Sequence, residues 1–210
     1  NVAVGFQALG SNTVGSGSVA VGPSALQGQN PATAVTMYNV AVGYNAGYSV
    51  STGVRNSIVG GIAGDSLTVG GNNVSMGYAS LSADTQGSGS VAIGAGALNV
   101  QNFTTATTTY NTAVGLDAGK AVTTGIQNTL IGGLAGDALT LGADNVAIGM
   151  NALGSDTLGS DSTAVGQGAL FTQNFTTATD TNNTAVGRHA GLLVTTGVEN
   201  TLIGGLSGDS

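Results

Sequence analysis

Few residues of this chain carry side chains that could do acid–base or nucleophilic chemistry. The sequence has one histidine, His189, no cysteine, and ten acidic residues among 210 positions. A serine–histidine–aspartate constellation needs its histidine in a pocket between two partners. His189 falls at a place where equivalent segments have Asn45 and Asp117, which is typical of a solvated turn. We therefore expect no catalytic residues and no enzymatic activity.

Three aspartates, Asp65, Asp137 and Asp209, are the only candidates for a metal site, and they are weak ones. Each follows a Gly-Gly-x-x-Gly segment close to the calcium-binding nonapeptide of parallel β-rolls, in which consecutive coils supply the aspartates. Here the aspartates recur only in every fourth coil. Four coils at about 4.8 Å each separate them by roughly 19 Å, far beyond a shared ion with oxygens at about 2.4 Å. We expect aspartates that bond their own turns, and no metal or other cofactor.

Three segments that are four residues longer than their neighbours carry the best candidates for binding a partner. Each contains a Gln-Asn pair and a threonine-rich run. Projecting loops often form the binding face of repeat proteins, and exposed aromatic rings could stack on sugars. The alternative is that the rings cover the apolar end of a neighbouring coil or chain. The candidate surface-binding residues are Gln29, Asn30, Gln101, Asn102, Phe103, Gln173, Asn174 and Phe175.

All these residues are positioned by a repeat that fills the chain. The pentad Asn/Ser-x-x-apolar-Gly begins twelve units, which have a 17-residue length except that the second of every four is a 21-residue unit. Four units make one 72-residue copy, so the copies are 1–72, 73–144 and a truncated 145–210. We expect 1–210 to be one continuous repeat region. The units start at Asn1, Ser18, Asn39, Asn56, Asn73, Ser90, Asn111, Asn128, Asn145, Ser162, Asn183 and Asn200.

The places within a unit, numbered from its Asn or Ser, predict an all-β fold. A 17-residue unit is too short for a helix pair, and the alternation in Asn1–Val4 is typical of a strand. Place 5 is Gly in all twelve units, and place 15 is Gly in the eight complete 17-residue units. Each unit is thus predicted to be one coil of a parallel β-solenoid (β-roll), with strands at places 1–4 and 10–14. Positive-φ glycines would form the turns, and the place 1 asparagines an amide ladder.

The apolar residues at place 4 predict that the chain forms an oligomer. Places 3 and 8 are mostly Ala, which buries little surface, so a single coil has a thin core. Place 4 lies on the opposite side of the strand and would expose an apolar stripe unless sister chains cover it. We expect a homotrimer; the alternative is a wider solenoid with place 4 inside one chain. The predicted trimer core is Val4, Val21, Val42, Val59, Met76, Ile93, Val114, Ile131, Ile148, Val165, Val186 and Ile203.

Composition excludes several partners. Three basic residues and a net charge of −7 cannot form the cationic surface of a nucleic-acid binder. No apolar stretch approaches the length of a membrane-spanning helix, so this segment is not expected to insert into a membrane. Thr occupies place 13 in seven of the eight complete 17-residue units. Regularly spaced threonines in a row can match the spacing of water molecules in ice. An ice-binding solenoid is therefore a remote alternative, as is a calcium-binding one.

Two families carry similar repeats. Ser90–Gly94 (Ser-Val-Ala-Ile-Gly), followed by Ala97, resembles the YadA-type head repeat of trimeric autotransporter adhesins. Asn111–Gly119 and Asn183–Gly191 are similar to repeats in tail fibres of phages, particularly marine ones. The first resemblance implies a trimer of left-handed parallel β-rolls, although the 72-residue period is not part of that pattern.

The resemblances imply an extracellular structural protein. The leading expectation is the shaft of a phage tail fibre on the virion, which spaces or presents a host-receptor-binding tip. The alternative is the head domain of a trimeric adhesin on a bacterial surface, which would bind host matrix or surfaces. A host-surface glycan or protein is the expected partner besides sister chains. Since neither end of the chain carries a capping unit, we expect it to be a segment of a longer fibre.

Overall fold

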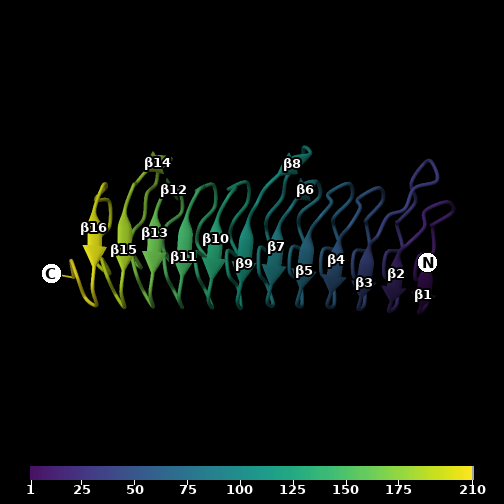
Figure 1. Cartoon of the computed structure of the whole chain (residues 1–210), viewed down its shortest axis with the longest axis horizontal. Helices are drawn as coiled ribbons and strands as arrows, with labels where there is room; N and C mark the ends of the chain where they lie inside the picture. The colour runs from purple at the N-terminus through teal and green to yellow at the C-terminus, as the bar shows by residue number, and fades with distance from the viewer. Residues whose placement is uncertain (210) are drawn as a thin grey trace. The chain divides into compact units, whose positions relative to one another are not determined.

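The chain folds into two compact units of the same kind of coil. The computed structural model describes residues 1–209, and the units are Asn1–Thr109 and the part from Tyr110 onward. The boundary falls at the end of the sixth coil, within the second 72-residue copy. The described residues contain strands and turns but no helix (Figure 1), so the predicted all-β parallel β-solenoid class is confirmed. The continuity of 1–210 as one region stays a prediction.

Each coil contributes one three-residue strand, at places 2–4, to a parallel sheet along one face of its unit (Figure 1). Within a unit each strand pairs with its successor place for place; Ala3, for example, lies opposite Ala20. The first unit contains β1 (Val2–Val4), β2 (Val19–Val21), β3 (Val40–Val42), β4 (Ser57–Val59), β5 (Val74–Met76) and β7 (Val91–Ile93). The second contains β9 (Thr112–Val114), β10 (Thr129–Ile131), β11 (Val146–Ile148), β13 (Thr163–Val165), β15 (Thr184–Val186) and β16 (Thr201–Ile203).

The prediction of a second strand at places 10–14 is wrong. Within residues 1–209 these places form turns and irregular backbone, and the remaining strands are two-residue pairs beside the inserts. Left-handed backbone is the reason: in the third coil φ is +54° at Asn45 and +60° at Gly47, which curls the chain before it can extend. The backbone N–H of Gly47 still donates to the Ala63 carbonyl of the next coil at 2.9 Å. The short pairs are β6 (Gly87–Ser88) with β8 (Thr107–Thr108) and β12 (Gly159–Ser160) with β14 (Thr179–Asp180).

The two repeated glycines are required for different reasons. At place 5 φ lies between +119° and +143°, a conformation that only glycine adopts readily. At place 15 no glycine has positive φ, so the predicted role of that glycine in a left-handed turn is wrong. A Cβ on Gly53 would instead lie 2.3 Å from the carbonyl oxygen of Gly70, one coil along. Close stacking of successive coils thus excludes a side chain at Gly53, Gly70, Gly125 and Gly142. At Gly15, Gly87 and Gly159 the polar side chain at place 12 of the same coil occupies the space instead.

The core of a coil is filled by complementary residues at places 9 and 12. Alanines at places 3 and 8, such as Ala20 and Ala25, are fully buried. Where place 9 is Leu26, place 12 is polar; where place 9 is Gly47, place 12 is Val50. A Cβ on Gly47 would approach Ile58 Cδ1 at 2.9 Å and Leu26 Cδ2 at 3.0 Å. Side chains of neighbouring coils therefore fill the space that each glycine leaves, as close packing requires.

The place 1 asparagines form a buried ladder that bonds mainly to backbone. Asn56 Nδ2 donates to the carbonyl of Gly70 in its own coil at 2.9 Å. Asn56 Oδ1 accepts from the backbone N–H of Asn73 in the next coil at 3.0 Å. Side-chain pairs such as Asn145 Nδ2 to Asn128 Oδ1, at 3.2 Å, are secondary. The predicted ladder is present, but each amide ties backbone groups of two coils together rather than its neighbouring amides alone.

Candidate functional site

The insert glutamines lie inside the coils and not on the surface. In the first unit, Gln101 Nε2 donates to Asp84 Oδ2 at 2.7 Å and to Ser90 Oγ at 2.9 Å. Asp84 Oδ1 accepts from the backbone N–H groups of Gly87 and Phe103, both at 3.1 Å. The aspartate is fully buried, and its carboxylate is compensated by three donors.

The same polar layer recurs in the other copies. In the second unit, Gln173 Nε2 donates to Asp156 Oδ2 at 2.6 Å and to Ser162 Oγ at 2.8 Å. In the first copy Asn12 replaces the aspartate, and Gln29 Nε2 reaches its Oδ1 at 3.4 Å. All three glutamines have no exposed surface, so the prediction that they belong to a surface-binding loop is wrong. A buried amide is stable here because the coil supplies hydrogen-bond partners that water would otherwise supply.

The insert phenylalanines are also buried. Phe103 and Phe175 are each 6% exposed, so the prediction that they form part of a binding surface is wrong. In the first copy Pro31 stands at this place and is buried as well. The carbonyls of the phenylalanines accept hydrogen bonds from Thr85 and Thr157 Oγ1, at 2.7 and 2.8 Å. Burial of an apolar ring is favoured, and burial is the outcome expected if the rings cover apolar coil surface.

The exposed part of each insert is a threonine-rich tip. The asparagines Asn30, Asn102 and Asn174 are exposed, and each accepts a hydrogen bond from a threonine of the preceding coil at 2.8, 3.1 and 3.0 Å. Residues 104–106 and 176–178 are exposed beyond them. In Figure 1 these segments, which lead into β8 and β14, extend past the neighbouring coils of their own unit. A surface contact through the inserts would therefore involve threonines and asparagines.

The place 13 threonines hold neighbouring coils together. Thr68 Oγ1 donates to the carbonyl of Thr85 at 2.9 Å, and Thr123 Oγ1 donates to that of Thr140 at 3.0 Å. These hydroxyl protons bond the protein itself and are not presented as a free array to water. The file thus has a structural role, and it supplies no argument for ice binding.

The candidate metal ligands lie apart from one another. Among residues 1–209 no three histidine, cysteine or acidic side chains gather into a group that could hold a metal ion. Asp65 lies in the first unit, and Asp137 and Asp209 lie in the second, in different coils. Burial raises the pKa of Asp65 more than hydrogen bonds from its own backbone and that of Ser66 lower it. Burial likewise raises the pKa of Asp137.

Three further aspartates of the second unit form an acidic file. Asp144, Asp161 and Asp180 lie on successive coils. Partial burial, followed by the negative charges of Asp180 and Asp144, raises the pKa of Asp161. Like charges in register repel, and charged residues make up only 6% of the whole chain.

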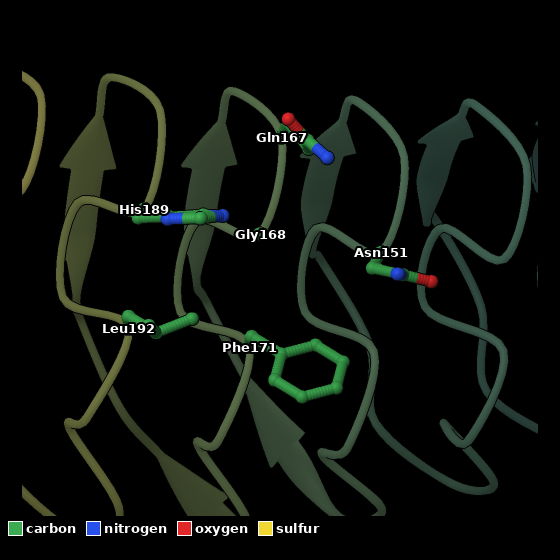
Figure 2. Close-up of a pocket in the computed structure, with 6 residues that line it drawn as sticks. All are labelled: Asn151, Gln167, Gly168, Phe171, His189 and Leu192. Carbon is green, nitrogen blue, oxygen red and sulfur yellow. The ribbon is translucent and has the colours of Figure 1, made fainter.

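His189 lies at a turn, as expected, and it lines a pocket of about 200 Å³ in the second unit (Figure 2). Its φ is +58°, and its side chain is half-buried. Of the residues that the structure describes, no aspartate, glutamate or serine lines the pocket, so the arrangement does not form a catalytic triad. The lining residues are Asn151, Gln167, Gly168, Phe171, His189 and Leu192.

The place 4 residues lie on the outer face of the sheet. Place 3 points into the coil and is buried in all coils but the first and the last, so place 4 points outward, as alternation along a strand requires. Exposure of the place 4 side chain ranges from half-buried, as at Val114, through 36% at Val59 to 72% at Ile203. The alternative of a solenoid with place 4 inside one chain is therefore excluded within each unit.

Sequence analysis missed the buried aspartates Asp84 and Asp156. A signal for them was present at place 12, where each copy begins with Asn or Asp and continues with Gln and Val, followed by Leu in the two complete copies. Because the polar pair recurs with the 72-residue period beside otherwise apolar occupants, it indicates an interior polar layer.

Comparisons with known proteins identify no relative of this chain: no protein-family model, curated protein or solved structure matches it. None of the described residues forms a helix long and apolar enough to cross a bilayer.

Proposed function

We propose that this chain is a structural fibre segment, a β-solenoid shaft that assembles as a homotrimer and spaces or presents a receptor-binding tip. The observation that carries the proposal is the apolar outer face of the sheet. In the first unit, places 2 and 4 are apolar in every strand except β4, where place 2 is Ser57. Successive strands are about 4.8 Å apart, so the apolar side chains form continuous columns.

Columns of this kind favour another copy of the chain as the partner. Monomeric proteins rarely expose continuous apolar surfaces larger than a few hundred Å². Burying a Val or Ile side chain contributes about 1.5–3 kcal/mol, and a sister chain offers the same side chains at the same spacing. In a closed symmetric oligomer every copy buries the same apolar face, so no such face remains exposed to recruit further chains into an aggregate. The choice of three copies, and of a left-handed coil, follows the resemblance to trimeric β-roll heads.

The leading owner of such a shaft is a phage tail fibre, which places the chain on the virion, outside cells. The Asn-Thr-Ala-Val-Gly units that begin at Asn111 and Asn183 support this choice by resemblance. The function is mechanical and requires neither catalysis, cofactor nor nucleic acid. The alternative is an adhesin head on a bacterial surface, and the projecting threonine-rich tips favour it because they present hydrogen-bonding groups to a host surface. Binding of the isolated segment to surfaces coated with matrix proteins would favour the adhesin.

The decisive measurement is the mass of the folded chain in solution by sedimentation equilibrium. We expect three times the monomer mass; a stably folded monomer would overturn the proposal. The variant Val114→Asp introduces a charge into the column and should shift the mass towards the monomer, since a buried unpaired charge is costly. Thr124→Asp, on an exposed place of the same coil, is the matched control and should remain a trimer. Circular dichroism should confirm that both variants are folded.

A further inference from the structure

The pocket beside His189 exists because one coil lacks a side chain that its neighbours have. Place 7 has a left-handed backbone in coils nine to eleven, where it is Asn151, Gly168 and His189. In Figure 2 the side chains of Asn151 and His189 both point along the direction in which the coils stack, toward the preceding coil. Gly168, in the coil between them, has no side chain and leaves a gap. A Cβ on Gly168 would lie 2.7 Å from His189 Cδ2, so the imidazole covers one side of the gap.

Apolar and neutral polar groups meet in this pocket. Phe171 and Leu192 are half-buried and supply its apolar wall. Phe171 lies across the step between two coils, with its ring 3.2 Å from where a Cβ on Gly154 would be. Above the ring, Gln167 supplies an amide and His189 an imidazole, groups that both donate and accept hydrogen bonds. Within residues 1–209, no aspartate, glutamate, lysine or arginine lines the pocket.

The surface around the pocket differs from the rest of the second unit. In the other coils of the second unit place 6 is a glycine or the exposed apolar residue Leu116 or Met150, but beside the pocket it is Gln167 and Arg188. Arg188 Nε donates to Gln167 Oε1 at 3.4 Å, a contact between two exposed side chains. Polar residues at the rim fit a surface that remains in contact with solvent when sister chains cover the apolar side chains of the sheet.

Other copies of the repeat do not combine these residues. In the first copy Ser24 occupies the place of Gly168, and in the second copy Gly96 is followed by Asn99 instead of a phenylalanine. The second copy also has the Asp117–Lys120 ion pair at 3.3 Å where the third has His189 and Leu192. The glycine, the aromatic ring and the imidazole therefore occur together once among residues 1–209.

We propose that this pocket binds one neutral sugar ring of a glycan. The apolar C–H face of the sugar would stack on Phe171, and its hydroxyls would bond the Gln167 amide and His189. A volume of about 200 Å³ is below the ~300–1,000 Å³ of drug-sized sites but several times the ~30 Å³ of a water molecule, which suits a single ring. The pocket lining, in the part of the chain that the structure describes, contains no acidic, lysine or arginine side chain, and the rim guanidinium of Arg188 already bonds Gln167, which favours a neutral ligand. The site lies within one chain and does not depend on the proposed trimer.

Binding is tested by saturation-transfer NMR on the full chain with methyl glycosides of glucose, galactose, mannose and N-acetylglucosamine. At least one should receive saturation with a dissociation constant in the millimolar range, because ligands of about 13 to 16 non-hydrogen atoms make few contacts and bind weakly. Phe171→Ala should weaken binding at least tenfold. If none of the four glycosides is saturated, the proposal is overturned.

The sharpest variant is Gly168→Asn. Asparagine tolerates the left-handed backbone at this place, where Asn151 has φ +58°. Its Cβ would lie 2.7 Å from His189 Cδ2, so the new side chain would displace the imidazole and occupy the pocket. It should abolish saturation transfer. Gly96→Asn, at place 7 of the sixth coil with φ +69°, is the matched control and should bind like the unmodified chain. Glycoside binding that survives Gly168→Asn contradicts the site. The mass of each variant is measured in parallel, so a monomer that binds sugar defeats the trimer and not the pocket.

Discussion

At the scale of single residues, the buried aspartates Asp84 and Asp156 need the most hydrogen-bond partners to be stable inside the coil. A carboxylate inside a protein is stable only when hydrogen bonds replace its hydration. Asp84 accepts from two backbone N–H groups and from Gln101, so both its oxygens are bonded. Removal of the aspartate therefore takes an acceptor from three donors at once.

The first prediction concerns Asp84→Ala. Taking this acceptor from buried donors should lower the free energy of unfolding by roughly 3–5 kcal/mol. Differential scanning calorimetry should record a clear fall in the melting temperature. Asp84→Asn should cost less, since its oxygen can still accept from the backbone and Asn12 occupies this place in the first copy. Asp144→Ala, on an exposed side chain, should leave the melting temperature nearly unchanged; an equal fall there would contradict the role of burial.

At the scale of the coil, the backbone conformation required at each place, more than strand propensity, determines which residues are allowed there. Each coil has three extended residues, and left-handed residues at places 7 and 9 turn it back upon itself. Gly60 and Gly61 are adjacent and illustrate two different demands. Gly60 has φ +138°, and a Cβ there would lie 2.4 Å from the Gly77 oxygen. Gly61 has no positive φ, and a Cβ would meet only Tyr78 at 3.6 Å, an ordinary contact.

Alanine at these two neighbours should therefore have opposite consequences. Gly60→Ala combines backbone strain with a clash between coils and should cost at least about 3 kcal/mol, or prevent folding. Gly61→Ala should change stability by no more than about 0.5 kcal/mol, or raise it slightly, by restricting the unfolded chain. Thermal unfolding followed by circular dichroism compares the two. Similar melting temperatures would show that close coil stacking is not what selects glycine at place 5.

At the scale of the whole molecule, the 72-residue period specifies which coil follows which. Coils of one length could otherwise stack in any order, since their strands pair alike. Ile58 fills space beside Gly47 and Gly64, whereas the coils with Leu at place 9 carry the polar layer at place 12. The second copy repeats this sequence of core types with Leu130 in place of Ile58, and the third repeats it as far as it extends. The period is therefore a packing unit of four coils and not only a sequence duplication.

Deletions test this account of the period. Removing residues 73–144, one whole copy, leaves every coil beside a neighbour of its usual type and should preserve the fold, with unchanged ellipticity per residue. Removing residues 56–72, a single coil, deletes Ile58 and leaves the space beside Gly47 unfilled. A cavity of that kind should lower the melting temperature by roughly 5 °C or more. Equal stability of the two deletions would contradict a four-coil packing unit.

The repeat pattern was sufficient to predict the coil length, a strand near the start of each coil, its register and the outward direction of place 4. Strict repetition makes equivalent residues stack, and alternation along a strand decides its two faces, so a pattern suffices there. Three features became evident only from the folded coils: Gln101 and Phe103 point inward, a carbonyl of the next coil requires glycine at position 53, and places 10–14 form turns. These outcomes depend on left-handed residues such as Asn45 and Leu26, whose types do not reveal their φ. Where the side chains after these left-handed residues point depends on contacts with neighbouring coils. Those contacts cannot be read from the sequence of one repeat.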